Sequence, residues 1–194
     1  MNMPKLGMEP IRRAALIDAA IAEIGAAGSL DVTVSRIARR AGVSSALAHH
    51  YFGGKDDILL AAMRQVLRDY GREVLRRLSG RTSPWARLEA IVEGSFAPSN
   101  FSGDVVSAWL NFYVLALSSD DARRLHRVYA SRLRSNLLSA LRPLAGDRAE
   151  SIAERAAFLI DGAYLNQGLS AGAPDGARAA AQVLLGLRAE LSRG

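Results

Sequence analysis

Apolar residues recur at helical spacing along almost the whole chain, and they predict an all-helical protein of about nine helices. The first helix is expected over 10–27, where isoleucine and alanine return every three or four residues. Two short helices are expected, one that starts after Thr33 and ends at about Arg40, and one over 45–50. A long helix is expected to follow over 55–78. Five more are expected near 84–96, 104–118, 120–142, 147–170 and 174–192.

Breaks rich in glycine, proline and serine separate these segments. Gly28 is a plausible C-terminal stop for the first helix, and Gly42 stands where the two short helices must turn. The stretch 79–84 ends the long helix, and 143–146 ends the helix predicted before it. The chain is therefore predicted to form a three-helix domain over 1–54 and a second helical domain over 55–194, connected by the helix over 55–78.

The segment from Thr33 to Lys55 has the layout of a helix-turn-helix, which inserts a short helix into the major groove of DNA. Small residues over 41–44, Ala-Gly-Val-Ser, allow the two helices to cross closely. Thr33 and Ser44 are suited to cap the two short helices. The small side chains at the start of the second helix would let its backbone approach the groove and the phosphates.

Ten residues of this segment and its flanks are the candidate DNA contacts. Most are hydrogen-bond donors suited to phosphate, and three lie where the second short helix would meet base edges; the ten are Arg12, Arg13, Thr33, Ser44, Ser45, Ala46, His49, His50, Tyr51 and Lys55. That helix has no Arg, Asn or Gln for bidentate base contacts, so DNA shape is expected to contribute to sequence choice. Thr33 and Ser44 have the alternative role of plain helix caps. Core positions are expected at Val34, Ile37, Val43, Leu47 and Phe52.

Charge agrees with a polyanionic partner. The chain has a net charge of +6, and residues 1–55 contain seven Lys or Arg against four acids. The other 139 residues contain 18 against 15, so net positive charge per residue is about two and a half times higher in the first segment. A basic segment of this kind suits nucleic acid, although an ordinary solvated surface is also basic in many proteins.

Several classes of function are not expected. The absence of cysteine excludes disulfides and thiol chemistry, and the first residues lack an apolar signal core. The most apolar stretch, 108–117, is too short to span a bilayer, so a soluble cytoplasmic protein without a membrane partner is expected. The histidines His49, His50 and His126 form no catalytic or metal-binding pattern, so neither an enzyme, a metal site nor a cofactor is expected.

The helix-turn-helix segment resembles the N-terminal signature of the TetR family of repressors. The resemblance rests on Thr33, Ile37-Ala38, 41–44, Tyr51-Phe52 and Lys55, which match in spacing without gaps. Many family members carry a tyrosine at the position of His49 and a bulky aliphatic residue at that of Ala48. Leu47 is expected to take the core role here, and the phosphate contact of that tyrosine passes to His49 or Tyr51.

Nine of the twelve aromatic residues lie after residue 80, so the second domain could hold an aromatic ligand site. Spacing places Trp109, Phe112 and Tyr113 on one helix face. Tyr129 and Tyr164 lie on neighbouring predicted helices, and Asp161 is a carboxylate in apolar company. These rings either form an ordinary core, with Asp161 paired to an arginine or a helix end, or an aromatic box for a quaternary ammonium ion.

The second domain also resembles the choline-responsive repressors of this family. The segments that carry the resemblance are MPKLGMEPIRR, AIVEGSF, AWLNFY, RLRSNLLSAL and LIDGAYL, with Tyr113 where a tryptophan is expected. The resemblance implies repression, relieved by choline, of genes that convert choline to glycine betaine. A homodimer built from the last two helices would place two DNA-reading domains on successive major-groove faces of a palindromic operator. A sensor of larger lipophilic cations or drugs is the alternative, and a DNA-binding protein without an effector is a third.

Overall fold

The computed structural model describes residues 7–192, and this part of the chain contains nine α-helices, one short 3-10 helix and no strand, which confirms the all-helical prediction. The helices are α1 Met8–Ala27, α2 Val34–Arg40, α3 Ser45–Phe52, α4 Lys55–Leu78, α5 Pro84–Ser95, α6 Gly103–Ser118, α7 Asp120–Ala145, η1 Gly146–Arg148, α8 Ala149–Leu169 and α9 Gly176–Leu191. Residues 1–6 of the predicted N-terminal domain lie outside the described residues.

Side-chain caps account for where most of the helices begin. In each case a hydroxyl or carboxylate accepts a hydrogen bond from a backbone N–H of the first turn; the capping residues are Thr33, Ser44, Ser83, Ser102, Ser119 and Asp175. Gly28 ends α1 with a φ of 62°, and Gly42 makes the turn between α2 and α3 with a φ of 69°. Both angles lie in the left-handed region that glycine adopts without strain.

Two helices end two or three residues later than the sequence predicts, and α1, α8 and α9 begin two residues from their predicted starts. α3 continues past His50 to Phe52, because the chain is turned by Gly53, whose φ is 75°. α7 passes through Pro143 and ends at Ala145. Proline lacks a backbone N–H, which costs a single hydrogen bond in the last turn of a helix whose inner face remains packed.

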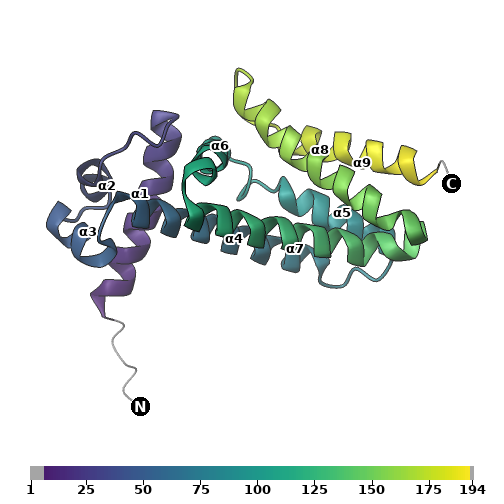
Figure 1. Ribbon diagram of the computed structural model, residues 1–194, viewed down its shortest axis with the longest axis horizontal. Helices are drawn as coiled ribbons and strands as arrows, with labels where there is room; N and C mark the ends of the chain where they lie inside the picture. The colour runs from purple at the N-terminus through teal and green to yellow at the C-terminus, as the bar shows by residue number, and fades with distance from the viewer. Residues whose placement is uncertain (1–6, 193–194) are drawn as a thin grey trace, which may run out of the picture.

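The helices α1, α2 and α3 form a compact unit, called the head below, at one end of the elongated molecule (Figure 1). α4 leaves the head and runs along the lower edge of the second domain beside α7 (Figure 1). Inside the head, the half-exposed Arg36 and Arg40 of α2 pair with the buried Glu23 of α1 at 2.8 and 3.2 Å. These two ion pairs tie α2 to α1.

The prediction that Leu47 fills the core of the head is wrong. Ala48 is fully buried, with 0% of its surface exposed, and it is the buried residue of α3. Leu47 is half-buried and lies outside the core. α3 therefore turns its small residue inward, which lets it approach α2 closely without a bulky aliphatic side chain.

α8 and α9 lie side by side along the upper edge of the second domain (Figure 1). Each turns most of its predicted apolar face toward the interior of the second domain, where Ile160 and Leu187 are fully buried. Other large apolar side chains on the two helices are exposed, namely Phe158, Leu159, Leu165, Leu169 and Leu185. The part of the chain described by the structure contains no helix long and apolar enough to cross a membrane.

Candidate DNA-binding surface and effector site

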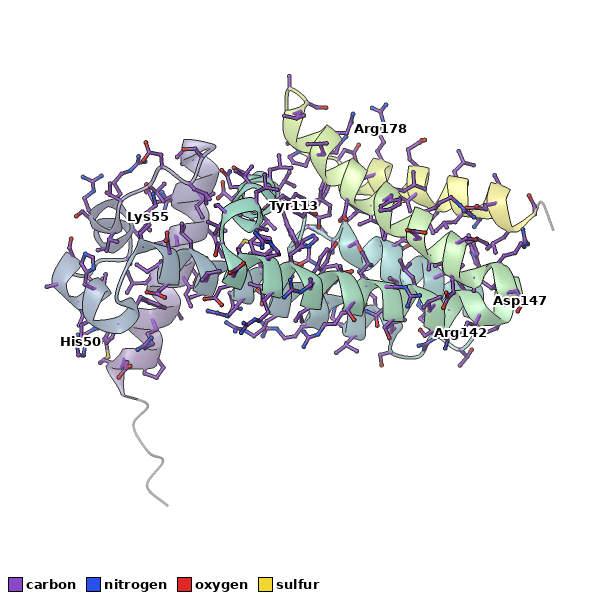
Figure 2. All side chains as sticks on the ribbon, viewed as in Figure 1. His50, Lys55, Tyr113, Arg142, Asp147 and Arg178 are labelled. Atoms are coloured by element: carbon purple, nitrogen blue, oxygen red, sulfur yellow. The ribbon has the colours of Figure 1, made fainter. Side chains whose placement is uncertain are left out.

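Nine of the ten candidate DNA contacts lie on the head helices or at their caps. Ser45 and Ser35 join the starts of α3 and α2 through a hydroxyl–hydroxyl hydrogen bond of 3.2 Å. The guanidinium of Arg13 in α1 lies 5.2 Å from the ring centroid of Tyr51 in α3. Lys55 begins α4 directly after α3. These contacts connect candidates on α3 to α2 and α1, and His50 and Lys55 lie at the head end of the molecule, away from the second domain's Tyr113 (Figure 2).

The two cap residues of the helix-turn-helix are suited to both roles considered for them. The hydroxyl of Thr33 accepts from the N–H of Arg36 at 3.2 Å, and that of Ser44 accepts from the N–H of Leu47 at 3.2 Å. Each hydroxyl keeps its own hydrogen, which is free to be donated to a phosphate oxygen. Both side chains are exposed at the positive end of a helix.

His49 is held by the turn that follows α3. Its Nδ1 donates to the backbone carbonyl of Gly53 at 2.9 Å, so Nε2 is the nitrogen left for another partner. In a neutral imidazole that nitrogen is an acceptor, which cannot bond to a phosphate oxygen. The phosphate contact that the sequence left open between His49 and Tyr51 is therefore better suited to the hydroxyl of Tyr51.

Arg13 is more constrained than its neighbour Arg12. Its Nε donates to Glu9 at 2.8 Å, and its guanidinium lies over Tyr51 and over Phe52, 5.1 Å from the latter's ring centroid. Stacking and pairing hold Arg13 in place and orient Tyr51. Arg12 and Lys55 form no ion pair among the described residues and are the simpler candidates for phosphate contact.

Replacing Arg12 or Lys55 with alanine is expected to weaken binding to all DNA sequences alike. Each loses one phosphate contact, so the slope of log affinity against log salt should fall by about 1. Fluorescence anisotropy over a salt series, with operator and unrelated duplexes, measures both quantities. Arg142→Ala, at the end of the molecule opposite the head (Figure 2), is the matched control and should keep the wild-type slope. A changed preference among sequences would contradict the phosphate assignment.

Trp109 is the centre of an aromatic cluster in the second domain. Its ring centroid lies 4.6 Å from that of Tyr129, 5.7 Å from Tyr113, 5.9 Å from Tyr164 and 6.0 Å from Phe112. The predicted shared face of α6 is therefore present, and α7 and α8 add one ring each. Trp109 is 2% exposed and Phe112 is fully buried, so the rings pack on one another as a core does.

Asp161 of α8 faces the cluster without a cationic partner. The hydroxyls of Tyr113 and Tyr129 both donate to its Oδ1, at 3.1 and 3.2 Å. Neither an arginine nor a helix end pairs with it among the described residues, in contrast to the pairing considered from the sequence. Burial raises the pKa of Asp161, against the opposing effects of the two tyrosine hydroxyls and of His126. The site thus holds a partly desolvated carboxylate compensated by neutral donors.

Two polar groups of the cluster behave differently from each other. The hydroxyl of Tyr164 donates to the carbonyls of Ser95 and Asn100, at 2.6 and 3.2 Å, and so ties α8 to the end of α5 and to the segment that follows it. The buried Nε1 of Trp109 has no hydrogen-bond partner among residues 7–192. An unpaired buried donor costs free energy, so its presence within a candidate site is a sign of a missing acceptor.

Sequence reasoning missed two members of the cluster. The ring of His126 lies 5.6 Å from Tyr113, and the ring of Tyr70 in α4 lies 5.7 Å from Tyr129. His126 precedes Tyr129 by three residues on α7, a spacing that could have placed both on one face. Burial raises the pKa of Tyr70 to about 12, so its hydroxyl is neutral at physiological pH.

The helix that carries most of the rings also contacts the head. The hydroxyl of Ser107 in α6 donates to the carbonyl of Ile24 in α1 at 3.4 Å. One residue further along α1, a Cβ placed on Gly25 would lie 2.7 Å from the Cα of Asp104. α6 and α1 therefore approach each other closely at these two points.

The geometry agrees with the proteins that this chain resembles. Residues 16–62 match the tetR family of bacterial regulatory proteins, and residues 84–192 match the C-terminal domain of BetI-type transcriptional repressors. The HTH-type transcriptional regulator BetI of Brucella melitensis is 53% identical over 182 residues, covering 93% of this chain and 92% of that protein. The regulator of the same name from Agrobacterium fabrum is 52% identical over 168 residues, covering 86% and 82%.

Solved structures share the fold. A putative transcriptional regulator from Pseudomonas aeruginosa superposes with a TM-score of 0.74 at 26% identity, covering 95% of this chain and 92% of that one. Another, from Saccharomonospora viridis and solved in complex with choline, superposes with a TM-score of 0.78 at 22% identity, covering 88% and 92%. At the latter identity the likeness concerns the fold alone.

Proposed function

Because the chain belongs to the TetR family of DNA-binding transcription regulators and has a BetI-type C-terminal domain, we propose that it is a choline-responsive repressor. In this proposal a homodimer binds a palindromic operator and leaves it when choline, or a related quaternary ammonium ion, binds the second domain. The genes controlled are those that convert choline to glycine betaine. The choline complex of the Saccharomonospora viridis protein supports this class of ligand for the fold.

The observation that carries the proposal is the carboxylate of Asp161 among aromatic rings. Its charge is compensated by two tyrosine hydroxyls, and no cation in the described part of the chain pairs with it. A quaternary ammonium ion offers no hydrogen bonds, so it would leave those tyrosine bonds intact while neutralising the charge. Ring faces of Trp109 and Tyr129 would add cation–π attraction, which is worth about 2 kcal/mol for a desolvated contact.

The free indole N–H favours a cation that also carries an oxygen. Trp109 Nε1 lies unpaired within the cluster, where it could donate to the hydroxyl oxygen of choline. Such a bond would satisfy the buried donor, and a cation without an acceptor would leave it unsatisfied. This is the feature that favours choline over a tetraalkylammonium ion of similar size.

Entry of the ligand requires the rings to separate, because they are packed at centroid distances of 4.6–6.0 Å. Separation moves α6 relative to α7 and α8, and α6 touches α1 at Gly25. The head would thereby take a second orientation that no longer fits the operator. Choline shifts this equilibrium only through its higher affinity for the open form.

The homodimer is proposed to form through α8 and α9. Phe158 is 67% exposed and Leu185 is 63% exposed, which leaves large apolar surface on the two helices. A hollow of about 700 Å³ lined by residues of α8, α9 and the segment between them lies beside this surface. A second copy would cover both and would set the spacing of the two heads.

Choline at millimolar concentration is expected to raise the melting temperature of the protein and to release it from DNA. Ligand binding stabilises the native state by mass action, and release follows from the shift toward the open form. The measurement is a gel shift with the region upstream of the protein's own gene, with and without choline, beside a thermal melt. An unchanged shift and an unchanged melting temperature would refute the choline response.

The same experiment tests the alternative effector class. Larger lipophilic cations require a wider separation of the rings than choline does, so they should release DNA poorly. If they release it better than choline does, the protein is a sensor of that class. If no cation releases the protein from DNA, the remaining interpretation is a DNA-binding protein without an effector.

A further inference from the structure

A second hollow lies on the outside of the second domain, between α4 and α7. Its volume is about 560 Å³, within the range of sites that hold small organic ligands. Apolar side chains of both helices line it, including Leu75 and Val128, which are 69% and 43% exposed. Exposed aliphatic groups at the edge of a hollow are surface that an apolar ligand would remove from water.

Arginines border the same hollow, which is called the α4–α7 groove below. They are Arg64 and Arg68 of α4 and Arg132 of α7. Arg68 donates to the neutral amide oxygen of Gln65 at 2.7 Å. Among the residues described, none of the three guanidiniums has a carboxylate within ion-pair distance, whereas Arg72 and Arg76 of the same helix are each paired. No acidic residue lines the groove.

We propose that the α4–α7 groove binds a single-chain amphiphile with an anionic head group, such as a fatty acid. The chain would lie on the apolar floor and the carboxylate would meet two guanidiniums, for which bidentate hydrogen bonding is well suited. A cation is disfavoured by three arginines, and a purely polar anion would leave the floor uncovered. The proposal goes beyond the choline response and does not depend on it.

The groove and the aromatic cluster are neighbours that share one side chain. Tyr129 lines the groove, and its ring also faces Trp109 at 4.6 Å while its hydroxyl donates to Asp161. Tyr70, also in the groove lining, contacts Tyr129 from α4. Tyr129 therefore borders both sites, which have opposite charge preference.

Decanoate, used below its micellar concentration, is the probe for the full-length protein. Calorimetric titration is expected to show saturable binding that weakens about tenfold or more in the double variant Arg64→Gln/Arg132→Gln, since the variant removes the charge-assisted hydrogen bonds to the carboxylate. Arg72→Gln removes one positive charge from the same helix outside the groove and is the matched control. It should bind decanoate as the wild type does.

Two further measurements, the dependence of affinity on fatty-acid chain length and competition with choline, distinguish this site from nonspecific anion binding and from the choline site. Affinity should rise from butyrate to decanoate because the floor is apolar, and inorganic phosphate should bind far more weakly. Equal binding of phosphate and decanoate, or equal weakening by Arg72→Gln, would overturn the proposal. So would complete displacement of decanoate by choline, which would mean one site.

A choline titration of the double variant keeps the two proposals distinguishable. If the double variant loses decanoate binding and still responds to choline, the proposal that decanoate binds in the α4–α7 groove is supported. Absence of a choline response in the wild type refutes only the proposed effector, and decanoate binding can still be measured. Absence of decanoate binding in the wild type refutes the groove and leaves the proposed effector untouched.

Discussion

Asp161→Asn is expected to weaken choline binding by about a hundredfold while operator binding stays at the wild-type level. An opposite charge at about 4 Å in a partly desolvated site contributes about 4 kcal/mol at an effective dielectric constant of 20, and a hundredfold corresponds to about 2.7 kcal/mol, so the lost charge alone is sufficient for the expected change. The asparagine side chain has the same shape, and its carbonyl oxygen still accepts from Tyr113 and Tyr129. Calorimetry with choline and anisotropy with operator DNA measure the two affinities.

The control for this variant is Asp147→Asn, an exposed aspartate far from the cluster at the end of the molecule opposite the head (Figure 2). It removes the same net charge and should leave choline affinity unchanged. If both variants lose choline affinity equally, the effect is one of overall charge. If neither loses it, Asp161 is not the counter-charge of the ligand.

The melting temperature of the Asp161→Asn variant gives an independent reading. Because burial raises the pKa of Asp161 in the folded protein, the native state holds that proton more tightly than the unfolded chain does. The free energy of unfolding of the wild type therefore decreases as pH rises through the pKa of Asp161 in the folded protein. The variant has no titrating carboxyl at this position and does not show that decrease. Without choline, the variant should melt at or above the wild-type temperature near neutral pH, with the difference vanishing in acid.

Gly25→Ala is expected to lower the melting temperature by about 5 °C and to weaken coupling between choline and DNA. The added Cβ would lie 2.1 Å from Oδ1 and 2.7 Å from the backbone Cα of Asp104, so a side-chain movement cannot relieve the clash. Overpacking of this kind costs about 1–3 kcal/mol, and each kcal/mol shifts the midpoint by about 2–4 °C for a chain of this length. Calorimetry gives the midpoint, and choline-dependent anisotropy gives the coupling.

A second glycine provides the contrast. Gly71 lies inside α4, and a Cβ placed on it would have no neighbouring atom of another segment within 4 Å. Gly71→Ala should stabilise the protein by about 0.5–1 kcal/mol, since alanine favours the helix. If Gly25→Ala stabilises to the same degree, α1 and α6 are not in tight contact and the proposed route to the head is wrong.

Local features of the fold were predictable from the sequence because they are set by neighbouring residues. α4 begins at Lys55 and ends at Leu78 as the pattern predicts, and Thr33 and Ser44 are caps because hydroxyls bond to nearby N–H groups. Periodicity also placed Trp109 and Tyr113 on one face of α6. Each of these inferences needs information from a few positions along one helix.

Features that depend on how helices meet were not predictable. Leu47 and Ala48 are adjacent, and only the rotation of α3 against α1 decides which is buried. The partners of Asp161 come from α6 and α7, 48 and 32 residues away. The position of Gly25 beneath α6 and the arginine-bordered groove between α4 and α7 likewise arise from distant segments.

The closed packing of the rings around Trp109 has a consequence for response time. If choline binds as proposed, an encounter succeeds only while the rings are apart, so the association rate is reduced by the fraction of molecules that are open. At high choline concentration the rate would level off at the frequency of opening. The delay between a rise in choline and the release of DNA would then be a property of the protein's own internal motion, independent of further increases in supply.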